Sequence, residues 1–174
     1  MDYYNPEHEP QRETHGELAY QAQLYFNLGY RHQMAQRLEL AIDFYRKSIA
    51  TLATAEAHTY LGWAYSYAGR LDDAIEECLR AIDIDPDFGN PYNDIGSYMM
   101  AKGDLDGAIP WLQKALLAPR YESYCFPHFN LGRVYEERGE FRRAAQEYRL
   151  ALAEDARFRP AEEALQRVQP LAGG

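Results

Sequence analysis

The residues that could do chemistry in this chain of 174 residues are scattered along it. Histidines that bind a metal or carry protons must converge in space, and helical metal sites often use two of them four residues apart. No such pair occurs, and the sequence therefore predicts no metal site. The five histidines are His8, His15, His32, His58 and His128.

Three of the pairs of neighbouring carboxylates were considered for acid–base catalysis, and their pattern does not suit it. Residues adjacent on a helix project about 100° apart, so their carboxylates diverge and are expected to be solvated. These pairs are Asp72–Asp73, Glu76–Glu77 and Glu136–Glu137. There is no glycine-rich phosphate loop and no nucleophile elbow. Cys78 and Cys125 form no CxxC motif, and Cys78 is expected to be a small core residue. We therefore predict no catalytic residues and no cofactor.

A strong regularity lies in small residues. A Leu-Gly or Ile-Gly pair recurs four times, and an alanine follows each glycine twelve residues later. Successive glycines are 33, 34 and 36 residues apart, so the period is about 34. The pairs are Leu28-Gly29, Leu61-Gly62, Ile95-Gly96 and Leu131-Gly132, and the alanines are Ala41, Ala74, Ala108 and Ala144.

This spacing of Leu-Gly, Tyr, Ala and Pro, cleanest in residues 55–88, resembles the tetratricopeptide repeat family. The resemblance implies an all-α fold. It would be a right-handed α-solenoid of four helix–turn–helix repeats with a capping helix at the C-terminal end.

The period also divides the chain. Residues 1–15 are polar and acidic and are expected to be a disordered or extended tail. A single domain is expected over 16–169, with repeats at about 22–54, 55–88, 89–124 and 125–158, and a capping helix at 160–169. Residues 170–174 are expected to be loose. The first repeat has no glycine between its helices, which marks it as the most divergent copy. Pro110 predicts a kink.

Proteins of the resembled family stack their first helices along a concave surface that binds extended or helical peptides. Carried over by register, this surface holds large aromatic rings, which are costly to expose unless a partner covers them. The alternative is that each ring packs on the adjacent repeat or on residues 1–15. The candidate peptide-binding residues are Phe26, Asn27, Tyr30, Trp63, Tyr67, Asn90, Asn93, Phe126, Phe129, Asn130 and Arg133.

Two of these asparagines share the tetrapeptide Phe-Asn-Leu-Gly. The amides of Asn27 and Asn130 could donate to and accept from a peptide backbone, or they could tie neighbouring helices together. Family members that capture the acidic tail of chaperones carry a clamp of Lys, Asn and Arg. Here Phe26 and Asn90 match the lysine sites and Asp94 matches the arginine site, which disfavours that role.

The net charge of −9 argues against nucleic acid and favours basic or neutral partners. No apolar run predicts a membrane span or a signal peptide, so we expect a cytoplasmic protein. The predicted function is a non-catalytic scaffold or adaptor that binds a peptide segment of a partner protein. The alternative is a self-assembling homo-oligomer, in which the tail or the cap helix packs in the groove of a neighbouring copy.

Overall fold

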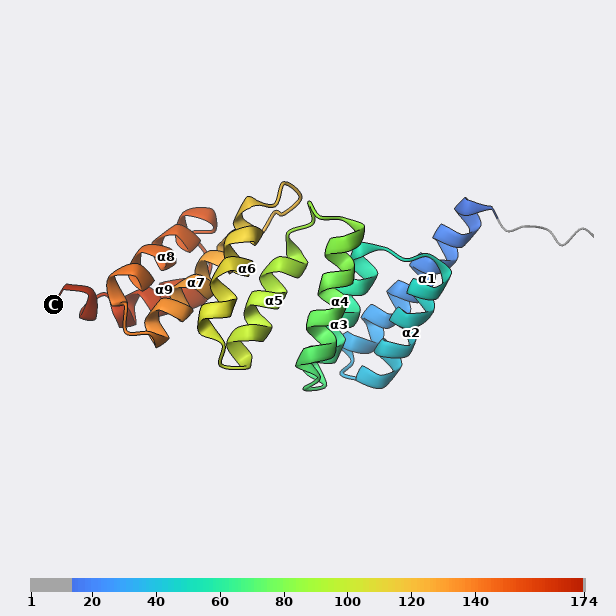
Figure 1. Ribbon diagram of the computed structural model, residues 1–174, viewed down its shortest axis with the longest axis horizontal. Coiled ribbons are helices and arrows are strands. Elements are labelled where there is room, and N and C mark those ends of the chain that lie inside the picture. Colours follow the sequence, from blue (N-terminus) through green and yellow to red (C-terminus); the bar gives the residue numbers. More distant parts are fainter. Residues whose placement is uncertain (1–13, 174) are drawn as a thin grey trace, which may run out of the picture.

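The computed structural model describes residues 14–173, which form nine α-helices and one short 3₁₀ turn. The helices follow one another in antiparallel pairs along the long axis of the molecule (Figure 1). They are α1 (His15–Met34), α2 (Leu38–Thr51), α3 (Ala55–Tyr67), α4 (Leu71–Ile84), α5 (Asn90–Ala101), α6 (Leu105–Leu117), α7 (Cys125–Glu137), α8 (Phe141–Glu154) and α9 (Arg159–Val168), and the turn is Leu171–Gly173. The tail expected at residues 1–15 lies, up to residue 13, outside the described residues.

The first helices of the pairs form the inner wall of the stack. Each of α1, α3, α5 and α7 contacts the next odd-numbered helix, whereas α2, α4, α6 and α8 do not contact one another. Elements that touch along a curved stack lie on its inside, and those that splay apart lie on its outside. The odd-numbered helices therefore line the concave face.

The recurring glycines explain the period, because each one makes room for a side chain sixteen residues later. A Cβ atom added to Gly132 would lie 2.4 Å from the ring of Tyr148, which is fully buried. A Cβ added to Gly96 would lie 2.5 Å from Leu112, which is also fully buried. Only glycine allows the two helices of a repeat to approach this closely.

The two helices of each repeat are joined by the same turn. A residue with positive φ ends the first helix, and its N–H bonds to the carbonyl three residues back. The next N–H bonds to the carbonyl five residues back, which is the Schellman motif. Glycine supplies the positive φ at Gly69 (75°), Gly103 (82°) and Gly139 (73°), and Gln36 supplies it at 58°. The first repeat lacks the glycine but keeps the same turn.

Replacing Gln36 with glycine is expected to raise the free energy of unfolding by up to about 1 kcal/mol, because a side chain is strained in the left-handed region. Urea denaturation followed by circular dichroism measures the change. The control is Gln36→Ala, which retains the Cβ atom and should bring no gain. If Gln36→Gly were less stable than Gln36→Ala, the positive φ of residue 36 would not be a source of strain that lowers the free energy of unfolding.

The longer join between α6 and α7 is fixed to the preceding join. The N–H of Arg120 donates to the Asp87 carbonyl oxygen at 3.0 Å, and the N–H of Gly89 donates to the Arg120 carbonyl oxygen at 3.1 Å. The guanidinium of Arg120 also pairs with Glu56 at 2.9 Å and Asp85 at 2.6 Å. This join is therefore held against the body of the stack.

The C-terminal end is covered by α9, whose buried side carries Ala161, Ala164 and Val168. Its other side is polar and exposed, as expected for the end of a repeat stack. Of residues 170–174, which were expected to be loose, the structure describes those up to residue 173. Leu171–Gly173 forms a 3₁₀ turn because Ala172 packs against the core and its carbonyl oxygen accepts from Arg142 Nε at 3.1 Å. Helix α6 runs unbroken through Pro110, and the kink there stays a prediction.

Candidate functional site

A cavity of about 350 Å³ opens on the concave face between α3, α5 and the start of α7. Four of the residues expected in the groove line it, namely Trp63, Asn90, Asn93 and Phe126. Five lining residues were not among those candidates: Thr59, Tyr60, Asp94, Tyr121 and Ser123. The inner faces of two repeats and the long join therefore meet at one site, and we call it the groove cavity.

A row of aromatic rings leads from α1 to this cavity, with Tyr60 at its centre. The ring centroid of Tyr60 lies 5.0 Å from that of Phe26, 6.0 Å from that of Tyr30 and 5.6 Å from that of Trp63. Trp63 in turn lies 5.7 Å from Tyr67. Phe26 and Trp63 are half-buried, whereas Tyr30 is 42% and Tyr67 is 63% exposed. The rings thus pack on one another and still present an open edge.

The candidates on α7 divide between the surface and the interior. Phe126 is 44% exposed and lies 5.2 Å from the ring of Phe158. Phe129 is half-buried and packs against Phe158 at 5.3 Å and Tyr148 at 5.7 Å, so most of it belongs to the core. Arg133 is exposed.

The two asparagines of the shared tetrapeptide differ in their contacts. Asn130 is buried, and its Nδ2 donates to Oδ1 of Asn93 at 3.0 Å, so it ties α7 to α5. Asn27 is exposed, and its Oδ1 accepts from Gln23 Nε2 at 3.0 Å on the same helix. The interhelical tie therefore occurs at Asn130 and not at Asn27.

Asp94 is the one carboxylate that lines the groove cavity. It is half-buried, and burial raises its pKa to about 7, while a hydrogen bond from Asn93 acts in the opposite direction. Burial also raises the pKa of Cys78, Tyr98 and Tyr121, and the neighbouring Asp94 carboxyl adds to the increase in each. The surroundings of Asp94 thus favour its neutral form in the absence of a cation.

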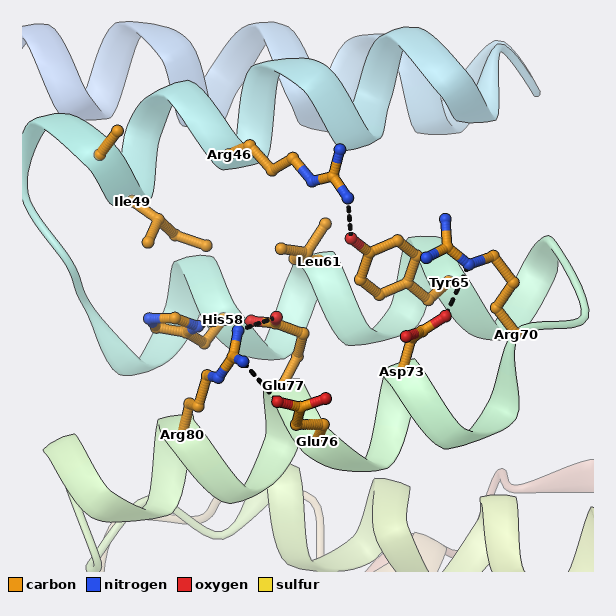
Figure 2. A pocket seen from close by; sticks show the side chains of 11 residues that line it. Arg46, Ile49, His58, Leu61, Tyr65, Arg70, Asp73, Glu76, Glu77 and Arg80 are labelled. Carbon is orange, nitrogen blue, oxygen red and sulfur yellow. Dashed lines mark hydrogen bonds and ion pairs between the residues drawn. The ribbon is translucent and has the colours of Figure 1, made fainter.

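A second cavity, of about 360 Å³, lies where α2, α3 and α4 meet, and its polar groups are paired with one another (Figure 2). Arg80 Nη1 donates to Glu77 at 2.6 Å, and Nδ1 of His58 lies 2.6 Å from the other oxygen of Glu77. Arg46 Nη2 donates to the Tyr65 hydroxyl at 2.7 Å. The expectation that Glu77 is solvated is wrong, because its side chain is buried against His58.

The pair His58–Glu77 occupies a position that recurs in every repeat, with its two residues always 19 apart. In two repeats the position holds two rings, and in the other two it holds a histidine and a glutamate. A position filled so interchangeably joins the two helices of each repeat and is not a catalytic centre. The pairs are Tyr25–Phe44 (centroids 6.5 Å apart), His58–Glu77 (2.6 Å), Tyr92–Trp111 (centroids 6.2 Å apart) and His128–Glu147 (2.7 Å).

Two further classes of site were sought over residues 14–173. This part of the chain contains no group of three or more His, Cys, Asp or Glu side chains placed to hold a metal ion. None of its helices combines the length and the apolar character needed to cross a bilayer.

Two family models, both described as tetratricopeptide repeat, match residues 55–88 and 128–160. The chain is a tetratricopeptide repeat protein. None of the curated proteins matches the sequence of this tetratricopeptide repeat protein significantly. The fold class predicted from the sequence is confirmed: an all-α, right-handed solenoid of four helix–turn–helix repeats with a C-terminal capping helix.

Solved structures agree with the fold. MamA protein is 24% identical, with 91% of this chain and 84% of that chain covered and a TM-score of 0.71. PilF of Pseudomonas aeruginosa is 18% identical over 87% of this chain and 68% of that one, with a TM-score of 0.81. The first TPR of Spaghetti (RPAP3), bound to the HSP90 peptide SRMEEVD, is 18% identical over 69% of this chain and 94% of that one, with a TM-score of 0.63.

Proposed function

We propose that this tetratricopeptide repeat protein is a non-catalytic cytoplasmic adaptor that binds an extended segment of a partner protein along its concave face. The observation that carries the proposal is the row of half-exposed rings from Tyr30 through Tyr60 and Trp63, which ends at the groove cavity. Exposed aromatic surface of this kind is typical of protein interfaces, where Trp and Tyr provide much of the binding energy.

The groove combines apolar anchors with a few polar groups. Trp63 and Phe126 border the cavity from two repeats, and Asn90 presents an exposed amide between them. An amide both donates and accepts, so it can bind the backbone of an extended peptide whatever its sequence. The first TPR of Spaghetti, which has the same fold, is bound to a peptide, and this supports peptide binding here.

Two alternatives are less well supported. An enzyme with the long join as a lid needs several ionisable groups beneath Tyr121, but Asp94 is the only carboxylate there and Arg120 ties the join down. Assembly through the cap helix needs an apolar outer face on α9, and that face carries Glu162, Glu163 and Gln166. Assembly through the tail involves residues that are outside the described part of the chain.

The proposal is tested by selecting a display library of random twelve-residue peptides against the full chain. Wild type is compared with Trp63→Ala plus Tyr30→Ala, which removes two rings of the row. Peptides enriched on wild type are expected to bind this variant at least about 30-fold more weakly, because a ring at an interface hot spot contributes about 2 kcal/mol or more.

The matched control is Leu79→Ala plus Leu150→Ala, which truncates two exposed apolar side chains on α4 and α8. It should enrich the same peptides as wild type with unchanged affinity, and circular dichroism should show that all three proteins are folded. Undiminished binding by the folded ring variant would overturn the proposal.

A further inference from the structure

We infer that the groove cavity receives the basic side chain of a lysine or arginine from the bound segment, with Asp94 as its counter-ion. The inference deepens the proposed function and rests on it. On this inference, Asp94 determines which partner binds. That partner is an extended segment with a cationic residue at the point where the segment crosses α5.

The first support is the shape and chemistry of the cavity. Tyr60, Trp63, Tyr121 and Phe126 line it together with the Asp94 carboxylate. Aromatic faces attract cations, and they also cover the aliphatic stem of a long basic side chain. A site with rings around one carboxylate therefore suits an ammonium or guanidinium group carried on an apolar stem.

The second support is the absence of an internal partner for this carboxylate. Within residues 14–173, the partly or fully buried carboxylates other than Asp94 and Asp155 each pair with an arginine or a histidine. Asp155 instead accepts the backbone N–H of Arg157 at 2.9 Å. Asp94 makes no ion pair with any described residue, and its hydrogen-bond partner is the side chain of Asn93. No Lys, Arg or His is among the residues that line the groove cavity.

The third support is that the titratable groups whose pKa the Asp94 carboxyl raises are neutral near pH 7. These groups are Tyr60 from α3, Cys78 from α4, Tyr98 on its own helix and Tyr121 from the long join. An incoming cation would thus replace no existing ion pair, and it would relieve the cost of a carboxylate half-buried without one. An acidic segment would be repelled at the same point.

The test uses pools of capped nine-residue synthetic peptides, labelled with a fluorophore, with a fixed central residue and degenerate flanks. The central residue is lysine, arginine, norleucine or glutamate, of which norleucine matches the length of lysine without its charge. Fluorescence anisotropy measures binding to wild type, to Asp94→Asn and to Asp43→Asn. Asp43 is exposed on α2, so its variant makes the same charge change away from the cavity.

Wild type and Asp43→Asn are expected to bind the lysine and arginine pools about tenfold more tightly than the norleucine pool. Asp94→Asn should bind the norleucine pool at least as well as wild type and lose the preference. Because the pKa of Asp94 is about 7, the wild-type preference should also decrease from pH 8 to pH 5.5, where lysine stays charged. This pH measurement on wild type does not depend on how well Asp94→Asn folds.

The outcomes separate the two proposals. Suppose that the pools bind wild type and that Trp63→Ala plus Tyr30→Ala lowers their affinity. The inference is then wrong, and the adaptor function stands, if wild type shows no preference for the lysine and arginine pools. The same holds if Asp94→Asn retains that preference. If no pool binds wild type, both proposals fail.

Discussion

Replacing Leu61 or Leu131 with alanine is expected to lower the free energy of unfolding by about 2–5 kcal/mol in each case. Both side chains are 2% exposed, and each precedes the glycine at which the two helices of its repeat approach. Truncation would leave a cavity between the two helices. Because the helices already approach closely at the neighbouring glycine, they cannot rearrange freely to fill it. Urea denaturation, followed by circular dichroism, measures the loss.

The same repeats provide matched controls for these variants. Leu79 on α4 is 40% exposed and Leu150 on α8 is 39% exposed, and alanine at either is expected to cost less than about 1 kcal/mol. Equal costs at buried and exposed leucines would show that the register of the repeats is wrong.

Glu77→Ala is expected to destabilise the chain by about 3 kcal/mol, since it leaves His58 buried without its partner and removes the carboxylate bound by Arg80. Its neighbour provides the control. Glu76 also pairs with Arg80 but is 61% exposed on its side chain, so Glu76→Ala should change stability by no more than about 0.5 kcal/mol.

The repeats also provide a rescue of the buried pair. His58→Tyr plus Glu77→Phe installs the Tyr25–Phe44 pair of the first repeat at the same position of the second. The double variant should recover most of the stability that Glu77→Ala loses, because two rings need no polar partner there. A double variant as unstable as Glu77→Ala would show that the position is not interchangeable between repeats.

The solenoid could be predicted because one local requirement recurs along the chain. Gly62, Gly96 and Gly132 each face a side chain sixteen residues later, so a single packing rule is written repeatedly into the sequence. The turn at Gln36 shows the limit of that rule. The backbone at Gln36 has the same positive φ as the glycine turns, but a glutamine does not predict a positive φ.

The groove cavity could be predicted only in part. Helical register placed Trp63, Asn90 and Asn93 on the face that borders it. Tyr121 lies in an aperiodic join, and its position depends on Arg120 pairing with Glu56, which is 64 residues away. No periodic pattern encodes such a contact.

Side-chain pairing was the least predictable feature. For Asn130 the sequence left two roles equally open, and the structure provides a bond to Asn93 across two repeats. Glu77 was expected to be solvated because it is adjacent to Glu76. Its partner in the structure is instead His58, which lies 19 residues earlier in the chain. The spacing of 19 recurs in all four repeats and was the signal that could have revealed the pair.

The most direct test of binding at the concave face uses the two tryptophans of the chain. Trp63 borders the groove cavity, whereas Trp111 lies on α6 against Tyr92, with the Lys114 ammonium 4.4 Å from its ring centroid. Each gives one indole N–H signal in a ¹⁵N correlation spectrum, and a peptide selected from the display library is titrated into the full chain. The Trp63 signal should shift to saturation while the Trp111 signal stays in place. A shift of Trp111 with Trp63 unmoved would contradict binding in the groove.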